Sequence, residues 1–136
     1  MLKSKGFIKK AFIVVLVGLS LTTALPKETF AASSYRLRLT YPFPGSMDSD
    51  GPETKVRGTT PFVNPDIATT ATNYYLSPGA GSRDEATRQI RNVTTTGRRN
   101  FTYNSGYGGA GNVLYINGYP DRMEYRSYTA TGTWSP

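Results

Sequence analysis

Three carboxylates follow one another at Asp48, Asp50 and Glu53, and they are the nearest approach to a metal site in this sequence. The order Asp-x-Asp-Gly is that of the middle of a calcium-binding loop. A complete EF-hand loop would also need an acidic residue at position 46 and a glutamate at position 57, where the chain has Ser46 and Arg57. We therefore predict a solvated loop without metal, and keep a non-standard calcium site as the alternative.

Two acidic pairs, Asp84-Glu85 and Asp121 with Glu124, have the residue types that glycoside hydrolysis uses. The 136-residue chain contains no histidine and no cysteine, so it lacks the commonest general base, a thiol nucleophile and the usual zinc ligands. The Gly-rich stretch 106–111 is not followed by a lysine or a helix, which favours a hairpin connection over a phosphate loop. We predict a protein that is not an enzyme and needs no cofactor.

Cationic and aromatic side chains suggest a binding patch made of Arg36, Arg38, Arg98, Arg99 and Tyr107. The first two arginines share one face of an expected strand, the next two are expected at a hairpin tip, and a tyrosine ring can stack on a sugar. If these segments meet, the patch would hold an anionic wall polymer, phospholipid headgroups or another protein. The alternative is that the arginines are edge charges that prevent strand-to-strand aggregation.

The formal net charge of +7 is unevenly distributed. Five lysines and one glutamate lie within residues 1–31, which leaves 11 cations and 8 carboxylates in residues 32–136. With so small an excess of positive charge, residues 32–136 do not have the dense positive field of a nucleic-acid-binding domain. We expect no nucleic-acid partner.

The N-terminal residues have the order of an export signal. Four lysines between positions 3 and 10 precede the uncharged run 11–21, and small residues follow at Ala24, Ala31 and Ala32. The apolar run is shorter than the roughly 20 residues that span a bilayer. We predict a signal peptide over 1–31, cut after Ala31. Cutting after Ala32 is the near alternative, cutting after Ala24 a weaker one, and an uncleaved anchor the remaining one. The mature protein would then be extracellular and meet the membrane only during export.

The rest of the chain is typical of short strands. Residues 35–41 alternate apolar and polar side chains, and so does the closing segment 122–134, where Tyr128, Ala130, Gly132 and Trp134 share one face. Further strands are expected at 67–76, 88–95, 100–104 and 112–117, with 55–62 ambiguous, loops at 45–55, 77–82 and 105–111, and turns at 64–66, 96–98 and 117–121. The strands 88–95 and 100–104 are expected to form a hairpin.

Six or seven short strands predict one all-β domain over residues 32–136, a small antiparallel β-sandwich. A small β-barrel is the alternative. At most one helical turn is expected, at 84–88.

Two stretches resemble a family of short exported proteins of Gram-positive bacteria whose function is unknown. The first is Arg57-Gly-Thr-Thr-Pro-Phe-Val-Asn-Pro65, similar to a basic-Thr-Thr segment followed by Asn-Pro. The second is Ser127-Tyr-Thr-Ala-Thr-Gly-Thr-Trp134, similar to a closing Ser-Tyr-Thr-x-x-Gly-x-Trp strand. The resemblance implies an exported β-domain and carries no catalytic residues. We expect a secreted non-catalytic protein that binds an envelope polymer or a protein partner, with an exported antimicrobial or toxin-like protein as the alternative.

Overall fold

The chain folds as an all-β sandwich in a computed structural model that describes residues 32–40, 47–67, 70–122 and 126–136. The predicted signal peptide lies outside the described residues. The strands are β1 (Ser33–Leu39), β2 (Asp48–Thr54), β3 (Phe62–Pro65), β4 (Thr72–Ser77), β5 (Ile90–Val93), β6 (Arg99–Asn100), β7 (Val113–Pro120) and β8 (Tyr128–Ser135). The described ranges contain no helix that could span a membrane.

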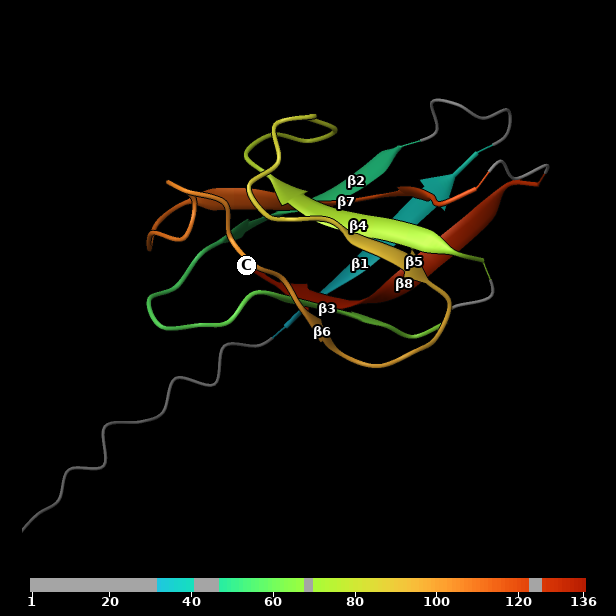
Figure 1. Ribbon diagram of the computed structural model, residues 1–136, viewed down its shortest axis with the longest axis horizontal. Helices are drawn as coiled ribbons and strands as arrows, with labels where there is room; N and C mark the ends of the chain where they lie inside the picture. Colours follow the sequence, from blue (N-terminus) through green and yellow to red (C-terminus); the bar gives the residue numbers. More distant parts are fainter. Residues whose placement is uncertain (1–31, 41–46, 68–69, 123–125) are drawn as a thin grey trace, which may run out of the picture.

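The strands form two antiparallel sheets that pack face to face (Figure 1). The first, here the β8 sheet, has the order β1-β8-β3-β6, and the second, the β7 sheet, has the order β2-β7-β4-β5. The predicted sandwich is therefore confirmed. The barrel alternative is wrong, because in the described residues the two sheets do not close into one.

The core lies between the sheets and is rich in aromatic side chains. Trp134 is fully buried, and Tyr35 and Tyr74 from opposite sheets meet edge to face with ring centroids 5.8 Å apart. Their hydroxyl groups are 3.3 Å apart, which gives these buried polar atoms a partner inside the core. Phe101 is a further aromatic member, and the aliphatic members of the core are Leu37, Leu39, Val63, Leu76, Ala86, Val93, Leu114, Ile116 and Ala130. Large rings supply apolar area that the few leucines, isoleucines and valines cannot.

The long closing strand has the alternation that the sequence predicts. In β8 the side chains of Ala130 and Trp134 are buried, whereas Thr129 is exposed and Thr131 and Thr133 are half-buried. This strand pairs with β1 on one side and with β3 on the other, so it lies inside its sheet. Period-two burial of one face is what a strand with one packed and one solvated face requires.

The loop predicted at 45–55 is wrong, because β2 occupies residues 48–54. This strand is polar throughout and carries no apolar alternation, so its sequence gives no strand signal. It is an edge strand that pairs only with β7, and its register shifts between Asp50 and Glu53, at the Gly51-Pro52 step. Edge strands tolerate glycine, proline and charge because one side of the ladder is open.

The turn predicted at 117–121 is also wrong, since β7 continues through Asn117 and Gly118 to Pro120. The Asn117 side chain is buried and satisfied: its Nδ2 donates to Ser77 Oγ at 2.7 Å, and its Oδ1 accepts from the Gly81 amide. A Cβ on Gly118 would lie 2.5 Å from Leu37 Cδ1, so this glycine allows close packing between sheets. The Asn-Gly pair therefore has a packing role instead of a turn role.

The predicted hairpin between 88–95 and 100–104 does not form, because β5 and β6 belong to different sheets. The segment that follows β6 instead crosses from one sheet to the other. The Phe101 amide donates to Pro61 O beside the β8 sheet, and Asn104 donates to Ala86 O beside the β7 sheet. Residues 101–104 therefore connect the two sheets along one side of the sandwich.

Candidate functional site

Hydroxyl and guanidinium groups lie in two rows on the outer surface of the β8 sheet. Cross-strand pairs place Ser34 beside Thr133, Arg36 beside Thr131, and Arg38 beside Thr129. Paired residues of an antiparallel sheet point to the same side. We call these six residues the threonine–arginine face. It follows from the two alternating strands, since every intervening residue of β1 and β8 is turned into the core except the half-buried Ser33 and Tyr128 at the strand ends.

Two carboxylates of β2 occupy the open backbone edge of β1. The Arg36 amide donates to Asp50 Oδ2 at 2.8 Å, and the Arg38 amide donates to Asp48 Oδ2 at 2.6 Å. Donors two residues apart on one strand are matched to acceptors two residues apart on the next. We call this arrangement the β1–β2 seam. It covers the N–H groups through which an edge strand would otherwise pair with another chain.

The seam also bears on the calcium alternative, because its carboxylates are the proposed ligands. The second oxygens of Asp48 and Asp50 accept from the amides of Ser49 and Gly51, and Glu53 accepts from the Ser33 hydroxyl. These acids lie along a strand instead of converging on one point. Among the described residues, no three Asp or Glu side chains are placed to hold a metal ion. The calcium alternative therefore has no geometric support.

Breaking the seam is expected to loosen the edge of β1. In an Asp48→Ala/Asp50→Ala variant, two charge-assisted hydrogen bonds are lost, and the free energy of unfolding should fall by about 2–4 kcal/mol. Urea denaturation measures this change, and size-exclusion chromatography tests whether the uncovered edge causes association. A variant with wild-type stability and no association would show that water replaces the carboxylates without cost.

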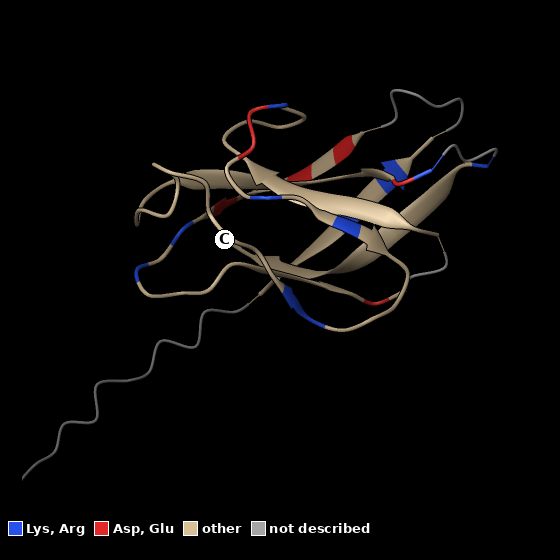
Figure 2. Ribbon diagram, in the orientation of Figure 1, with Lys and Arg blue, Asp and Glu red and all other residues tan. Residues whose placement is uncertain are grey.

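The five residues of the predicted patch do not come together. Arg36 and Arg38 lie on β1, at one edge of the β8 sheet, and Arg98 and Arg99 lie at β6, the opposite edge. Three strand spacings of about 4.8 Å separate these edges. Figure 2 shows the basic segments of β1 and β6 well apart. The topology therefore leaves two separate arginine pairs.

Arg98 and Arg99 are engaged by their own surroundings. The Arg98 guanidinium lies 3.9 Å from the centroid of the Phe62 ring, and its Nε donates to Asn100 Oδ1. Arg99 donates to Gly97 O at 2.7 Å and to Thr95 Oγ1 at 2.6 Å, which ties together the turn before β6. These contacts are typical of a structural role.

Tyr107 also lies apart from the arginine pairs. It belongs to the Gly-rich connection between β6 and β7, and its hydroxyl donates to Asp84 Oδ2 at 2.7 Å. This hydrogen bond to the carboxylate raises the pKa of the Tyr107 phenol. The same bond occupies one member of the acidic pair Asp84-Glu85, and Glu85 accepts from Gln89. In the second pair, Glu124 lies outside the described residues.

A buried lysine was not singled out by its sequence context. Lys55 is 4 % exposed, its ammonium donates to both oxygens of Thr59, and it lies 5.5 Å from the centroid of the Tyr103 ring. Burial lowers the pKa of this amine. A lysine in a polar loop carries no sequence signal of burial. One feature of the sequence does set it apart: residues 32–136 contain ten arginines, and Lys55 is their only lysine.

Comparison with known proteins adds no relative. No protein-family model matches the chain, and no curated protein or solved structure was found to match it. The resemblance to exported Gram-positive proteins therefore stays a prediction.

Proposed function

We propose that this chain is exported and acts without catalysis, by binding an anionic polymer of the cell envelope through the threonine–arginine face. The proposal revises the predicted patch to the part that shares one surface. Arg98, Arg99 and Tyr107 are left out, because their side chains are engaged elsewhere.

The spacing of Arg36 and Arg38 is the observation that carries this proposal. Both side chains are exposed, and the strand rise places their Cα atoms about 6.7 Å apart. Guanidinium groups repeated along a rigid strand match anionic groups repeated along a polymer, and Arg binds phosphate or carboxylate through a planar fork. The β1–β2 seam holds the backbone beneath them, so the spacing is preorganised.

The adjoining hydroxyl groups supply the second contact of the same surface. The three threonines of this surface form a row on β8: Thr129, Thr131 and Thr133. Each lies opposite one of the three β1 residues of the threonine–arginine face. Hydroxyl groups donate and accept hydrogen bonds, which suits the sugar or polyol portions of an envelope polymer. A row of arginines beside a row of threonines therefore fits a ligand that alternates charge and hydroxyl groups.

Loss of the two guanidinium groups should weaken polymer binding. We expect the Arg36→Gln/Arg38→Gln variant to bind purified cell-wall sacculi about tenfold more weakly, given up to ~1 kcal/mol for each exposed ion pair. Co-sedimentation across a salt series measures the affinity. Anionic lipid vesicles run in parallel distinguish a wall polymer from phospholipid headgroups as the ligand.

The matched control is Arg57→Gln/Arg83→Gln, which removes the same charge from two exposed loop positions. If both variants lose binding equally, or if wild-type binding vanishes at moderate salt, the arginines of β1 are edge charges and the proposal fails. Killing of neighbouring cells by protein that binds no polymer would favour the antimicrobial alternative. Capture of one protein from envelope extracts without polymer binding would favour a protein partner.

A further inference from the structure

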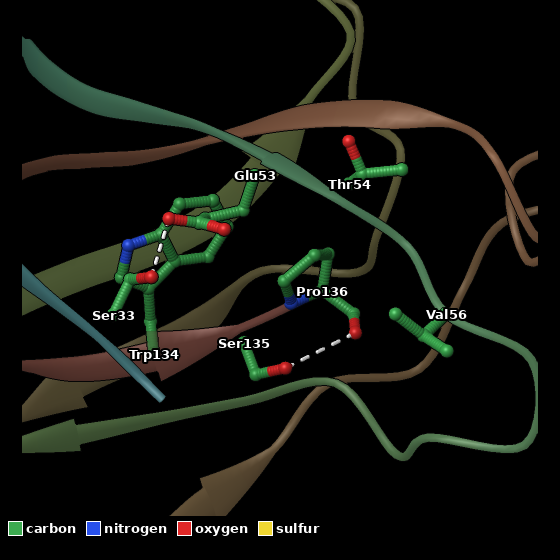
Figure 3. A pocket seen from close by; sticks show the side chains of 7 residues that line it. All are labelled: Ser33, Glu53, Thr54, Val56, Trp134, Ser135 and Pro136. Carbon is green, nitrogen blue, oxygen red and sulfur yellow. Dashed lines mark hydrogen bonds between the residues drawn. The ribbon is translucent and has the colours of Figure 1, made fainter. Parts of the chain in front are cut away.

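A small pocket opens where β1 begins and β8 ends. It measures about 100 Å³ and is lined by Ser33, Glu53, Thr54, Val56, Trp134, Ser135 and Pro136. Figure 3 shows the Ser33 hydroxyl and the Glu53 carboxylate joined by a hydrogen bond next to the Trp134 ring. Glu53 is the only ionisable side chain that lines it. A pocket with a carboxylate side chain and several hydroxyl groups favours a small cation that donates hydrogen bonds.

Backbone alternation identifies which group of the chain faces this carboxylate. The amides of Arg36 and Arg38 point away from β8 and toward β2, where Asp50 and Asp48 accept them. In an antiparallel strand every second residue directs its N–H to the same edge. Continued toward the start of the strand, the same alternation directs first the Ser34 amide and then the nitrogen of residue 32 to the β2 side. The next carboxylate of β2 in that direction is Glu53.

We propose that the pocket binds the α-ammonium group of the processed chain at Ala32. Cutting after Ala31 converts the nitrogen of this exposed residue into a cation, one residue before the Ser33 hydroxyl that Glu53 already accepts. Asp48, Asp50 and Glu53 then accept from three nitrogens of the β1 edge, those of Arg38, Arg36 and Ala32, with the Ser34 amide lying between the last two. The ammonium group completes the β1–β2 seam at its outer end.

The proposal distinguishes between the two predicted cleavage sites. Cutting after Ala32 would place the charge on the Ser33 nitrogen, which by the same alternation points toward β8 and not toward β2. An ammonium group there would lie in the ladder that pairs Ser33 with Trp134. The geometry thus favours Ala32 as the first residue of the mature chain.

This inference rests on the export and processing proposed above, and one preparation tests both steps separately. The protein is purified from the culture medium, and its first residue is read by N-terminal sequencing. The pKa of the α-amine is then measured from the pH dependence of trace acylation, followed in the tryptic peptide that ends at Arg36. We expect a value about one unit above the usual ~7.7–8.0, because an opposite charge favours the protonated amine.

Glu53→Gln should return the α-amine pKa to its usual range, whereas the matched Glu85→Gln, which alters another hydrogen-bonded glutamate, should not. If Glu53→Gln does not fold, the comparison is made between folded and denatured wild-type protein. An α-amine pKa that is the same in both overturns the inference and leaves export and polymer binding intact. A first residue other than Ala32 overturns it at the processing step.

The thermal midpoint provides an independent readout. An amine whose pKa is raised in the folded state stabilises the protein below the unfolded-state pKa, and this stabilisation is lost as the pH rises through the folded-state value. The difference in midpoint between wild type and Glu53→Gln should therefore be largest near pH 7 and shrink above pH 9. A difference that is constant from pH 7 to pH 10 would assign the effect to the Ser33 contact alone.

Discussion

Replacing Gly132 with alanine is expected to remove a large part of the stability of this protein. A Cβ at this position would lie 2.3 Å from Asn64 O, 2.8 Å from Pro65 Cα and 2.9 Å from Tyr35 Cε1. Two of these atoms belong to the backbone of β3, which is held in register with β8 through the pairs Asn64–Thr133 and Pro65–Gly132. The neighbouring strand therefore cannot move aside without losing its ladder.

We expect the free energy of unfolding to fall by about 3 kcal/mol or more, and the melting temperature by roughly 12 °C or more. Thermal unfolding followed by circular dichroism measures this change. Gly109→Ala is the matched control, because its nearest neighbour, Asn112 Nδ2, would lie 3.8 Å from the new Cβ. Equal stability of the two variants would mean that β3 and β8 are less tightly packed than the structure has them.

Alkaline pH should unfold the protein cooperatively between about pH 11 and pH 12. Tyr35, Tyr74 and Tyr75 are at most 3 % exposed, and burial raises the pKa of each phenol, to about 12 for Tyr75. For Tyr35 the adjacent Tyr74 raises the pKa further. Because the folded state holds these protons above pH 10 and the unfolded state releases them, stability is lost as the pH rises.

The size of this loss is comparable with the whole stability of a small domain. A buried phenol that stays protonated at pH 11 lowers the free energy of unfolding there by about 1.4 kcal/mol, because its unfolded-state pKa is about 10, and the loss grows with pH. Total stabilities are about 5–15 kcal/mol. Lys55 acts in the opposite direction: its lowered pKa adds stability as the pH rises, but only up to its unfolded-state value of about 10.5.

Absorbance at 295 nm, which reports tyrosinate, and near-ultraviolet circular dichroism should change in one transition. The diagnostic signal is one steep step that both signals share. Gradual ionisation of all ten tyrosines with unchanged circular dichroism would contradict the burial of the Tyr35–Tyr74 pair.

The sequence by itself determined the all-β class of this fold. It did so through the strands that bury only one face. The alternation in β1 and β8 predicts both strands, and it assigns Arg36, Arg38 and the threonines of β8 to outer faces. This works because the pleat places successive side chains on opposite sides, so burial of one face imposes a period of two on the residues.

Only the tertiary structure decided which strands are neighbours, and thereby which side chains share a surface. β2 pairs through its backbone and caps the β1 edge with Asp48 and Asp50, so its polar sequence does not resemble a strand. Arg98 is 60 positions from Arg38 in a chain whose pairing order is not sequential, and no local pattern states that β8 and β3 separate them. Strand pairing depends on contacts between distant segments, because each edge is completed by whichever segment buries its face against the common core.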